Sequence, residues 1–226
     1  REGSLRRALE GQDPSFETLS APGFFGVEFY FQPQNSHHYT KLCPAPVSPK
    51  YLIKEKGSRF VRRMDPHFQP HSHSMVGGWL ISQTLGFWSA LRLFWNLFRP
   101  GLSPAASFSL RHMDKKAELT IQNEHIHNHE HGLQIGFTIE EMALRVLNLL
   151  RSIGMTDNFG DVVYFVGHGS SSVNNPHYAA YDCGACSGRP GSVNARVIAH
   201  MANLAEVRER LAAEGLVIPE KTRFVG

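Results

Sequence analysis

The stretch from Val162 to Arg196 reads VVYFVGHGSSSVNNPHYAAYDCGACSGRPGSVNAR and contains the pattern that decides the expected fold. Residues 162–166 are all apolar and are followed by a Gly-His-Gly turn, which is typical of a short buried strand that ends sharply. In open α/β sheets, ligands bind outside the carboxyl ends of the strands. The pattern therefore predicts that His168 lies at such an edge.

A second loop, 180–191, carries Cys183. An imidazole and a thiolate together form the mixed nitrogen and sulfur donor set that suits zinc. Two side chains do not hold a zinc ion, so at least one more ligand must come from elsewhere. On spacing alone, the alternative for His168 is a hydrogen-bonded structural histidine at the end of a strand.

Residues 137–154 have the clearest helical pattern in the chain. Thr138 and Glu141 are spaced as a capping box, and Gly154 is the expected stop. The apolar stripe of this helix consists of Met142, Val146, Leu149 and Ile153. The helix leads into the strand at 162–166, which makes a crossover unit of the kind found in parallel sheets.

After the cysteine loop, Ser192 can cap another helix. Its buried side is predicted to include Val193, Val197 and Met201, and it is expected to break near Asn203 before a further helix that ends at Gly215. The amino end of the helix that starts at Ser192 would face the loop with Cys183, where its dipole favours a thiolate or a bound anion.

The amino-terminal region predicts a helix from near Ser4 to Gly11, with Leu5 and Leu9 on one side. A strand is expected at 24–31. The stretch 32–70 contains six prolines and little periodicity, so it is expected to be mostly irregular.

The expected fold class is thus α/β, with a mostly parallel sheet flanked by helices and a Pro-rich irregular and helical insertion. Residues 1–50 are expected to form the first part of the α/β core, and residues 51–132 the insertion. Residues 133–226 would form the second part of the core, with the zinc-ligand loops.

Several long runs carry a family resemblance. GHGSSSVNNPHYAAYDCGAC at 167–186, with GLQIGFTIEEMALRVLNLLRSIGMTDNF before it and GRPGSVNAR after it, resembles the carboxyl-terminal half of the DabA-type inorganic carbon transporter subunits. The resemblance extends upstream through KLCPAPVSPK, GFFGVEFYF and SLRRALE. It is weakest between about Tyr51 and Glu124.

The resemblance implies a core and a zinc site similar to those of the β-carbonic anhydrases. In that site a Cys-x-Asp-x-Arg motif supplies a Cys and an Asp, and a distant His and Cys complete the set. His168 and Cys183 match the distant pair, and Arg1 matches the motif arginine. The Cys and Asp would precede Arg1, so the chain is expected to be a fragment that binds zinc poorly by itself.

The resemblance also implies a function. The intact protein would hydrate CO2 to bicarbonate at the zinc site, with Arg1 gripping the motif aspartate and so freeing a position for water. It would work in energy-coupled uptake with a DabB-type proton-translocating membrane subunit, as a peripheral protein at the cytoplasmic face of the membrane. Activity is expected only in the full-length protein with its membrane partner.

Composition agrees with a folded protein of this kind. The 226 residues are 42% hydrophobic, which is enough to bury a sizeable core. The net charge of +3 is small and dispersed, which argues against nucleic acid as a partner. Three cysteines without a disulfide framework favour a reducing compartment.

The segment 79–98 contains all three tryptophans of the chain and would just span a bilayer. Arg92 argues against a lipid-exposed span, because a central arginine costs roughly 2.5–3.5 kcal/mol on insertion scales. A core helix or helical hairpin is the favoured interpretation. The alternatives are a helix that docks on a membrane partner and a transmembrane span.

Other patterns leave alternatives open. The run His125, His127, His129 and His131 would line one face if extended, but a solvated loop is favoured over a metal site. Cys186 forms a Cys-x-x-Cys pair with Cys183, so a thiol oxidoreductase is one rival function. A zinc-binding scaffold subunit without turnover is the other.

Overall fold

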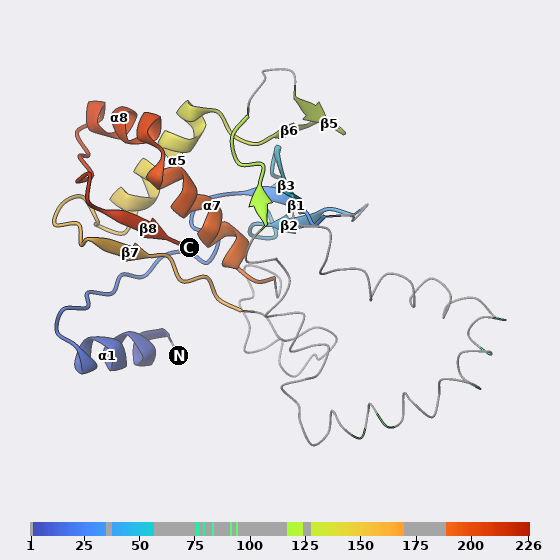
Figure 1. The fold of residues 1–226 in the computed structure, drawn as a ribbon, viewed down its shortest axis with the longest axis horizontal. Coiled ribbons are helices and arrows are strands. Elements are labelled where there is room, and N and C mark those ends of the chain that lie inside the picture. The colour runs from blue at the N-terminus through green and yellow to red at the C-terminus, as the bar shows by residue number, and fades with distance from the viewer. Residues whose placement is uncertain are drawn as a thin grey trace.

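The computed structural model describes residues 2–34, 38–56, 117–123, 128–169 and 189–226, together with five helical positions between 76 and 94 (Figure 1). Arg1, Cys183 and Cys186 lie outside the described residues, as do His125 and His127.

A mixed six-stranded sheet lies at the centre of the described fold. Its strands are β1 (Phe29–Gln32), β2 (Thr40–Leu42), β3 (Tyr51–Lys56), β4 (Glu118–Leu119), β5 (His129–Glu130) and β6 (Leu133–Ile135). The strand order is β2-β1-β3-β6-β5, and β4 pairs with β3. The pairs β1–β3 and β3–β6 are parallel, whereas β1–β2, β3–β4 and β5–β6 are antiparallel. The expected α/β class is confirmed, but the expectation of a mostly parallel sheet is wrong for this sheet.

The first strand begins later than the sequence suggested. The expected strand at 24–31 is wrong in its first half, because Phe25 and Gly26 have φ angles of 52° and 68° and form a turn. Such left-handed backbone cannot continue a strand. The regular strand therefore starts only at Phe29.

The stretch expected to be irregular contains two strands. β3 is a central strand that pairs with β1, β4 and β6, and it begins at Tyr51, the first residue of the expected insertion. Its charged residues are accommodated by partners far away in sequence. Lys54 forms an ion pair with Glu130, and the carboxylate of the buried Glu55 accepts a hydrogen bond from the backbone N–H of Gln34.

Among the residues that the structure describes, three helices cover the core: α5 (Ile139–Ser152), α7 (Ser192–Asn203) and α8 (Ala205–Ala213). The predicted capping box of α5 is confirmed, because the Thr138 hydroxyl accepts from the Glu141 N–H and the Glu141 carboxylate accepts from the Thr138 N–H. Gly154, with φ of 77°, follows the end of the helix as expected. The predicted stripe residues Met142, Val146 and Leu149 are buried, and Ile153 packs against the core.

The predicted helix pair near the carboxyl terminus is also confirmed, including its break after Asn203 and the glycine stop at Gly215. The cap is different. Gly191, and not Ser192, is the N-cap residue of α7, and no side chain caps this helix end. The predicted apolar side of α7 is fully buried at Val193, Val197 and Met201.

The helix α1 (Glu2–Gln12) forms where it was expected, but its apolar side is open to solvent. Leu5 is 61% exposed and Leu9 is also exposed. The helix is tied to the turn that follows it by hydrogen bonds from Arg6 to Thr18 and from Thr18 to Glu10. In Figure 1, α1 lies on the far side of β7 from α5 and α8.

The strand predicted at 162–166 exists as β7 (Val162–Tyr164), which pairs in parallel with β8 (Arg223–Val225). These two strands form a separate sheet among the described residues. The strand was expected to be buried on both faces. This is wrong for the face that carries Val162, Tyr164 and Val166, which are exposed, whereas Phe165 on the other face is buried.

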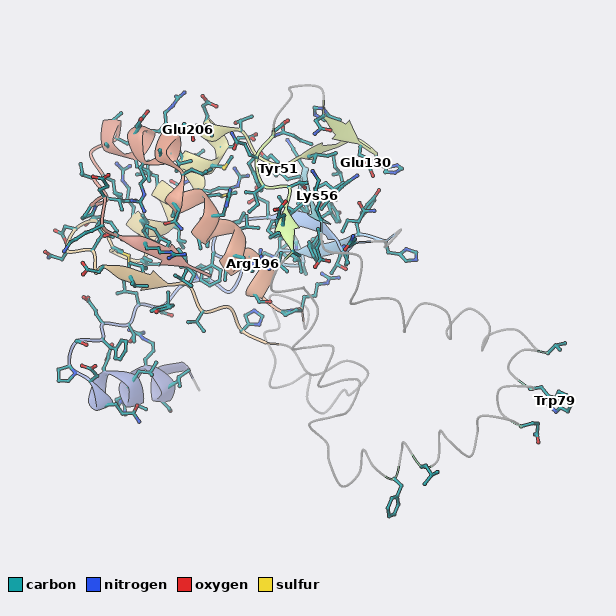
Figure 2. The ribbon with its side chains drawn as sticks, viewed as in Figure 1. Tyr51, Lys56, Trp79, Glu130, Arg196 and Glu206 are labelled. Carbon is teal, nitrogen blue, oxygen red and sulfur yellow. The ribbon has the colours of Figure 1, made fainter. Side chains whose placement is uncertain are left out.

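The segment 79–98 lies mostly outside the described residues. Trp79, Leu91 and Phe94 are helical and exposed, and Figure 2 shows Trp79 on the side of the molecule opposite α8. Among the described residues, no helix combines the length and the apolar character needed to cross a bilayer.

Candidate functional site

His168 lies four residues beyond the last residue of β7, at the amino end of α7. The backbone N–H of Gly191 donates a 2.9 Å hydrogen bond to the carbonyl oxygen of His168. His168 therefore lies beyond the carboxyl end of a parallel strand, where the sequence placed it.

Two glycines, Gly167 and Gly191, allow the backbone segments to meet at this point. A Cβ atom on Gly167 would lie 2.5 Å from the carbonyl oxygen of Gly191, and one on Gly191 would lie 2.6 Å from the carbonyl oxygen of Gly23. The same Cβ on Gly191 would lie 3.4 Å from Cδ2 of the His168 ring. Side chains at either position would push these segments apart, so the glycines hold the histidine close to the start of α7.

The imidazole of His168 has a defined backbone partner. Its Nδ1 lies 3.1 Å from the carbonyl oxygen of Gly169. Because a carbonyl oxygen can only accept, Nδ1 carries the proton, and in the neutral ring the lone pair then resides on Nε2. Metal-bound histidines commonly show this arrangement, in which one ring nitrogen donates to a backbone carbonyl and the other binds the metal.

The amino end of α7 adds a favourable field for negative charge at the same place. Its first turn contains no acidic residue, and the N-cap Gly191 provides no side-chain acceptor for the first N–H groups. These groups carry the positive end of the helix dipole. An anion close to His168 would be stabilised by them.

The other predicted site residues cannot be placed beside His168, because Arg1 and Cys183 lie outside the described residues. Cys186, which forms the Cys-x-x-Cys pair with Cys183, lies outside them as well. Within the part of the chain that the structure describes, no three His, Cys, Asp or Glu side chains gather as a metal site. The described residues thus include one of the predicted ligands, His168.

Cys43 is the one cysteine among the described residues, and its surroundings are those of a structural residue. It is buried, and its Sγ lies 3.5 Å from the carbonyl oxygen of Val47. Burial raises the pKa of the Cys43 thiol, so the thiol form is favoured over the reactive thiolate.

A polar network joins β3, β6 and α5. The sequence predicted only the capping box of Thr138 and Glu141 and not the other contacts of this network. The hydroxyl of Tyr51 donates to Oε1 of Glu141 at 2.8 Å, and the amide of Gln134 donates to Oε2 at 2.9 Å. The Arg145 guanidinium lies 4.6 Å from the centre of the Tyr51 ring and pairs with Glu28 at 2.5 Å. These contacts tie α5 to the sheet, and Figure 2 shows Tyr51 at this junction.

The pKa of Glu141 reflects this network. Burial of the carboxyl would raise its pKa, but hydrogen bonds from the Thr138 N–H, Tyr51 and Gln134, together with the charge of Arg145, lower it. Burial and the bond to Glu141 raise the pKa of Tyr51. Both groups therefore keep their ordinary charge states at neutral pH, as expected of a structural network.

The described part of the histidine run, His129 to His131, is not one extended strand. His129 lies in β5, but His131 has a φ of 51° and starts the turn to β6, with its ring 5.8 Å from that of Tyr39.

A hollow of about 420 Å³ lies elsewhere, between α5 and α8, and does not include His168. It is lined by Ile139, Glu140, Glu206, Glu209, Arg210 and Ala213.

Comparison with known proteins identifies the family. The family described as "Probable inorganic carbon transporter subunit DabA" matches residues 1–226. A protein of that name from Azotobacter vinelandii is 59% identical over 99% of this chain and 26% of its own length. Another, from Nitrosospira multiformis, is 54% identical over 98% of this chain and 25% of its own length.

A more distant relative, "Probable inorganic carbon transporter subunit DabA 2" from Rhodopirellula baltica, is 35% identical over all of this chain and 22% of its own length. No solved structure matches the chain. The chain spans about a quarter of the length of these relatives. The resemblance carried by its sequence motifs is confirmed, and the chain belongs to the DabA family of probable inorganic carbon transporter subunits.

Proposed function

We propose that the full-length protein that carries this chain is a subunit of an inorganic carbon uptake complex and hydrates CO2 to bicarbonate at a zinc site that includes His168. The family supports a role in inorganic carbon transport. The observation that carries the site is the hydrogen bond from Nδ1 of His168 to the carbonyl oxygen of Gly169, which in the neutral ring puts the lone pair on Nε2, the nitrogen that would bind the metal.

Cys183 is the second proposed zinc ligand within this chain, and the remaining ligands would come from outside residues 1–226. When bound, zinc lowers the pKa of its water from about 15.7 to roughly 7, which supplies a nucleophile near neutral pH. Arg1 is proposed to hold a carboxylate of the site through its planar guanidinium.

The residues around His168 would each contribute to this chemistry. The carbonyl of Gly169 orients the imidazole, and the contact of Gly167 with Gly191 fixes its distance from α7. The positive end of the α7 dipole would favour bicarbonate, which is an anion, over neutral CO2. The proposed site thus stabilises the charge that hydration creates.

The proposed partner is a DabB-type proton-translocating membrane subunit, with this protein bound peripherally at the cytoplasmic face of the membrane. The relatives are named as transporter subunits, which supports the presence of partner subunits. Coupling to proton movement would make hydration effectively one-way and retain bicarbonate in the cell.

The test is CO2 hydration by the full-length protein, measured by stopped flow with and without the membrane partner. We expect the substitution His168→Ala to abolish hydration, and His129→Ala, in the β5 hairpin, to leave it unchanged. Hydration that survives His168→Ala would refute the proposed site.

Two outcomes would support the rival functions. Bound zinc without hydration, even in the presence of the membrane partner, would indicate a scaffold subunit. A thiol oxidoreductase would need both Cys183 and Cys186, so the substitution Cys186→Ser should abolish its function. Under our proposal, carbon uptake persists in the Cys186→Ser protein.

A further inference from the structure

One face of the small sheet formed by β7 and β8 is packed against the core. The rings of Phe165 and Phe224 are stacked with their centres 5.6 Å apart, and Phe25 contacts Phe165 edge-on at 5.6 Å. All three rings are buried in the core beneath α7. The inner face is therefore fully packed by residues of this chain.

The opposite face is apolar and uncovered. Val162, Tyr164 and Val166 alternate with the half-buried Val163 and the buried Phe165, and they are 46%, 64% and 80% exposed. Parallel sheets normally have both faces covered, and a two-stranded sheet is at most marginally stable alone. An exposed apolar face on a parallel pair therefore indicates that another layer belongs there.

The outer edge of β7 is open as well. The Phe165 N–H donates to the Val225 carbonyl at 2.8 Å, so this amide points towards β8. Because amides alternate between the two edges of a strand, those of Tyr164 and Val166 point the other way. No described strand pairs with that edge. Residues 162–166 also contain no charge and no proline, the features that normally protect an edge strand from pairing.

The helix α1 presents a second uncovered apolar surface. It has 11 residues, and a helix this short is marginal without a packing partner. Leu5, Leu9 and Phe16 are exposed. Among the described residues, the side-chain hydrogen bonds of α1 join Arg6 and Glu10 to Thr18 in the turn that follows the helix. Figure 1 places α1 beyond β7, on the side away from α5 and α8.

We infer that the outer face and open edge of β7, together with α1, form a docking surface for the part of the same polypeptide that lies outside residues 1–226. Its relatives are about four times as long as this chain, so a large covalently attached partner is present at the same concentration as the surface itself. The occupant adds at least one strand beside β7 and covers its apolar face. This inference does not depend on zinc or on CO2 hydration.

Thiol labelling of the purified full-length subunit tests the inference. The substitution Val166→Cys places a thiol on the proposed surface, and Val217→Cys places one at a matched valine that is 67% exposed and lies between α8 and β8. The labelling of each position is followed by mass spectrometry of its peptide. We expect the thiol at 166 to react more than about tenfold more slowly than the thiol at 217.

Equal labelling rates in the full-length subunit would overturn the inference. Slow labelling at 166 that appears only at high protein concentration would overturn it too, because a second copy would then be the occupant. Slow labelling at 166 that appears only when the membrane subunit is present would also overturn the inference. Protection in the dilute, isolated subunit supports an occupant within the polypeptide.

A charge on the surface provides a second readout. In the full-length subunit, Tyr164→Asp should increase cleavage by trypsin under native conditions, because a carboxylate at 164 would lie in the covered interface. The matched substitution Val217→Asp should leave the cleavage pattern unchanged. Unchanged cleavage in both variants would contradict the inference.

Discussion

The backbone N–H of Gly191 donates a hydrogen bond of 2.9 Å to the carbonyl oxygen of His168, which joins the end of β7 to the start of α7. The contact is made by backbone atoms, so it does not depend on the side chain of either residue. The position of His168 therefore depends on the glycines around it.

The first prediction concerns these glycines. The substitution Gly191→Ala places a Cβ about 2.6 Å from the backbone oxygen of Gly23, and backbone cannot move aside as a side-chain end can. We expect the free energy of unfolding to fall by about 1–3 kcal/mol, the usual cost of overpacking. Urea denaturation measures this loss. Gly169→Ala is the control, since nothing lies within 4 Å of its added Cβ, and equal losses in both variants would contradict the account.

A second prediction concerns Asn194, which is buried at the start of α7. Its side-chain amide donates to the carbonyl oxygens of Val27 at 2.8 Å and Leu42 at 3.0 Å. Replacement by alanine leaves both acceptors buried without this donor, so we expect a loss of about 2–4 kcal/mol in the free energy of unfolding. The exposed Asn148 in α5 is the matched position, where alanine should change stability by less than about 0.5 kcal/mol. A neutral Asn194→Ala variant would show that these bonds do not stabilise the fold.

The third prediction concerns pH. The folded state lowers the pKa of Glu141 below its ordinary value of 4.5, so the unfolded state binds the proton more readily. The resulting stability is fully present above the ordinary pKa and is lost as pH falls through the lowered value in the folded state. In the Glu141→Gln variant, stability should therefore decline less steeply between neutral and acid pH.

The midpoint of urea denaturation, followed as a function of pH, measures this dependence. The neighbouring Glu140 is the control, because it is exposed and pairs with Arg210 at the surface. Such surface pairs contribute little, so Glu140→Gln should keep the acid-dependent decline of the parent protein. Parallel curves for the Glu141→Gln variant and the parent protein would contradict the role of the network.

The features that sequence predicted well are those set by local rules. The capping box of Thr138 and Glu141, the glycine stop at Gly154 and the apolar stripe together fixed α5 to within a residue or two. The position of His168 beyond a strand end followed from the apolar run and the glycine turn. The long motifs identified the family.

The features that sequence missed depend on distant partners. β3 carries Lys54 and Glu55 and lies after a Pro-rich stretch, so its pattern did not indicate a central strand. Its charges are satisfied by Glu130 and the backbone of Gln34, which no local pattern reveals. The exposure of Tyr164 was missed for a related reason, since an apolar run indicates that a face needs cover but not which segment provides it.

The most direct test of the proposed zinc site is the metal content of the purified full-length subunit and of its His168→Ala and His129→Ala variants, measured by mass spectrometry of the bound metal. We predict zinc in the parent protein and in the His129→Ala variant, and its loss from the His168→Ala variant, because removing one ligand leaves the set incomplete. Undiminished zinc in a folded His168→Ala protein would contradict the claim that this imidazole binds the metal.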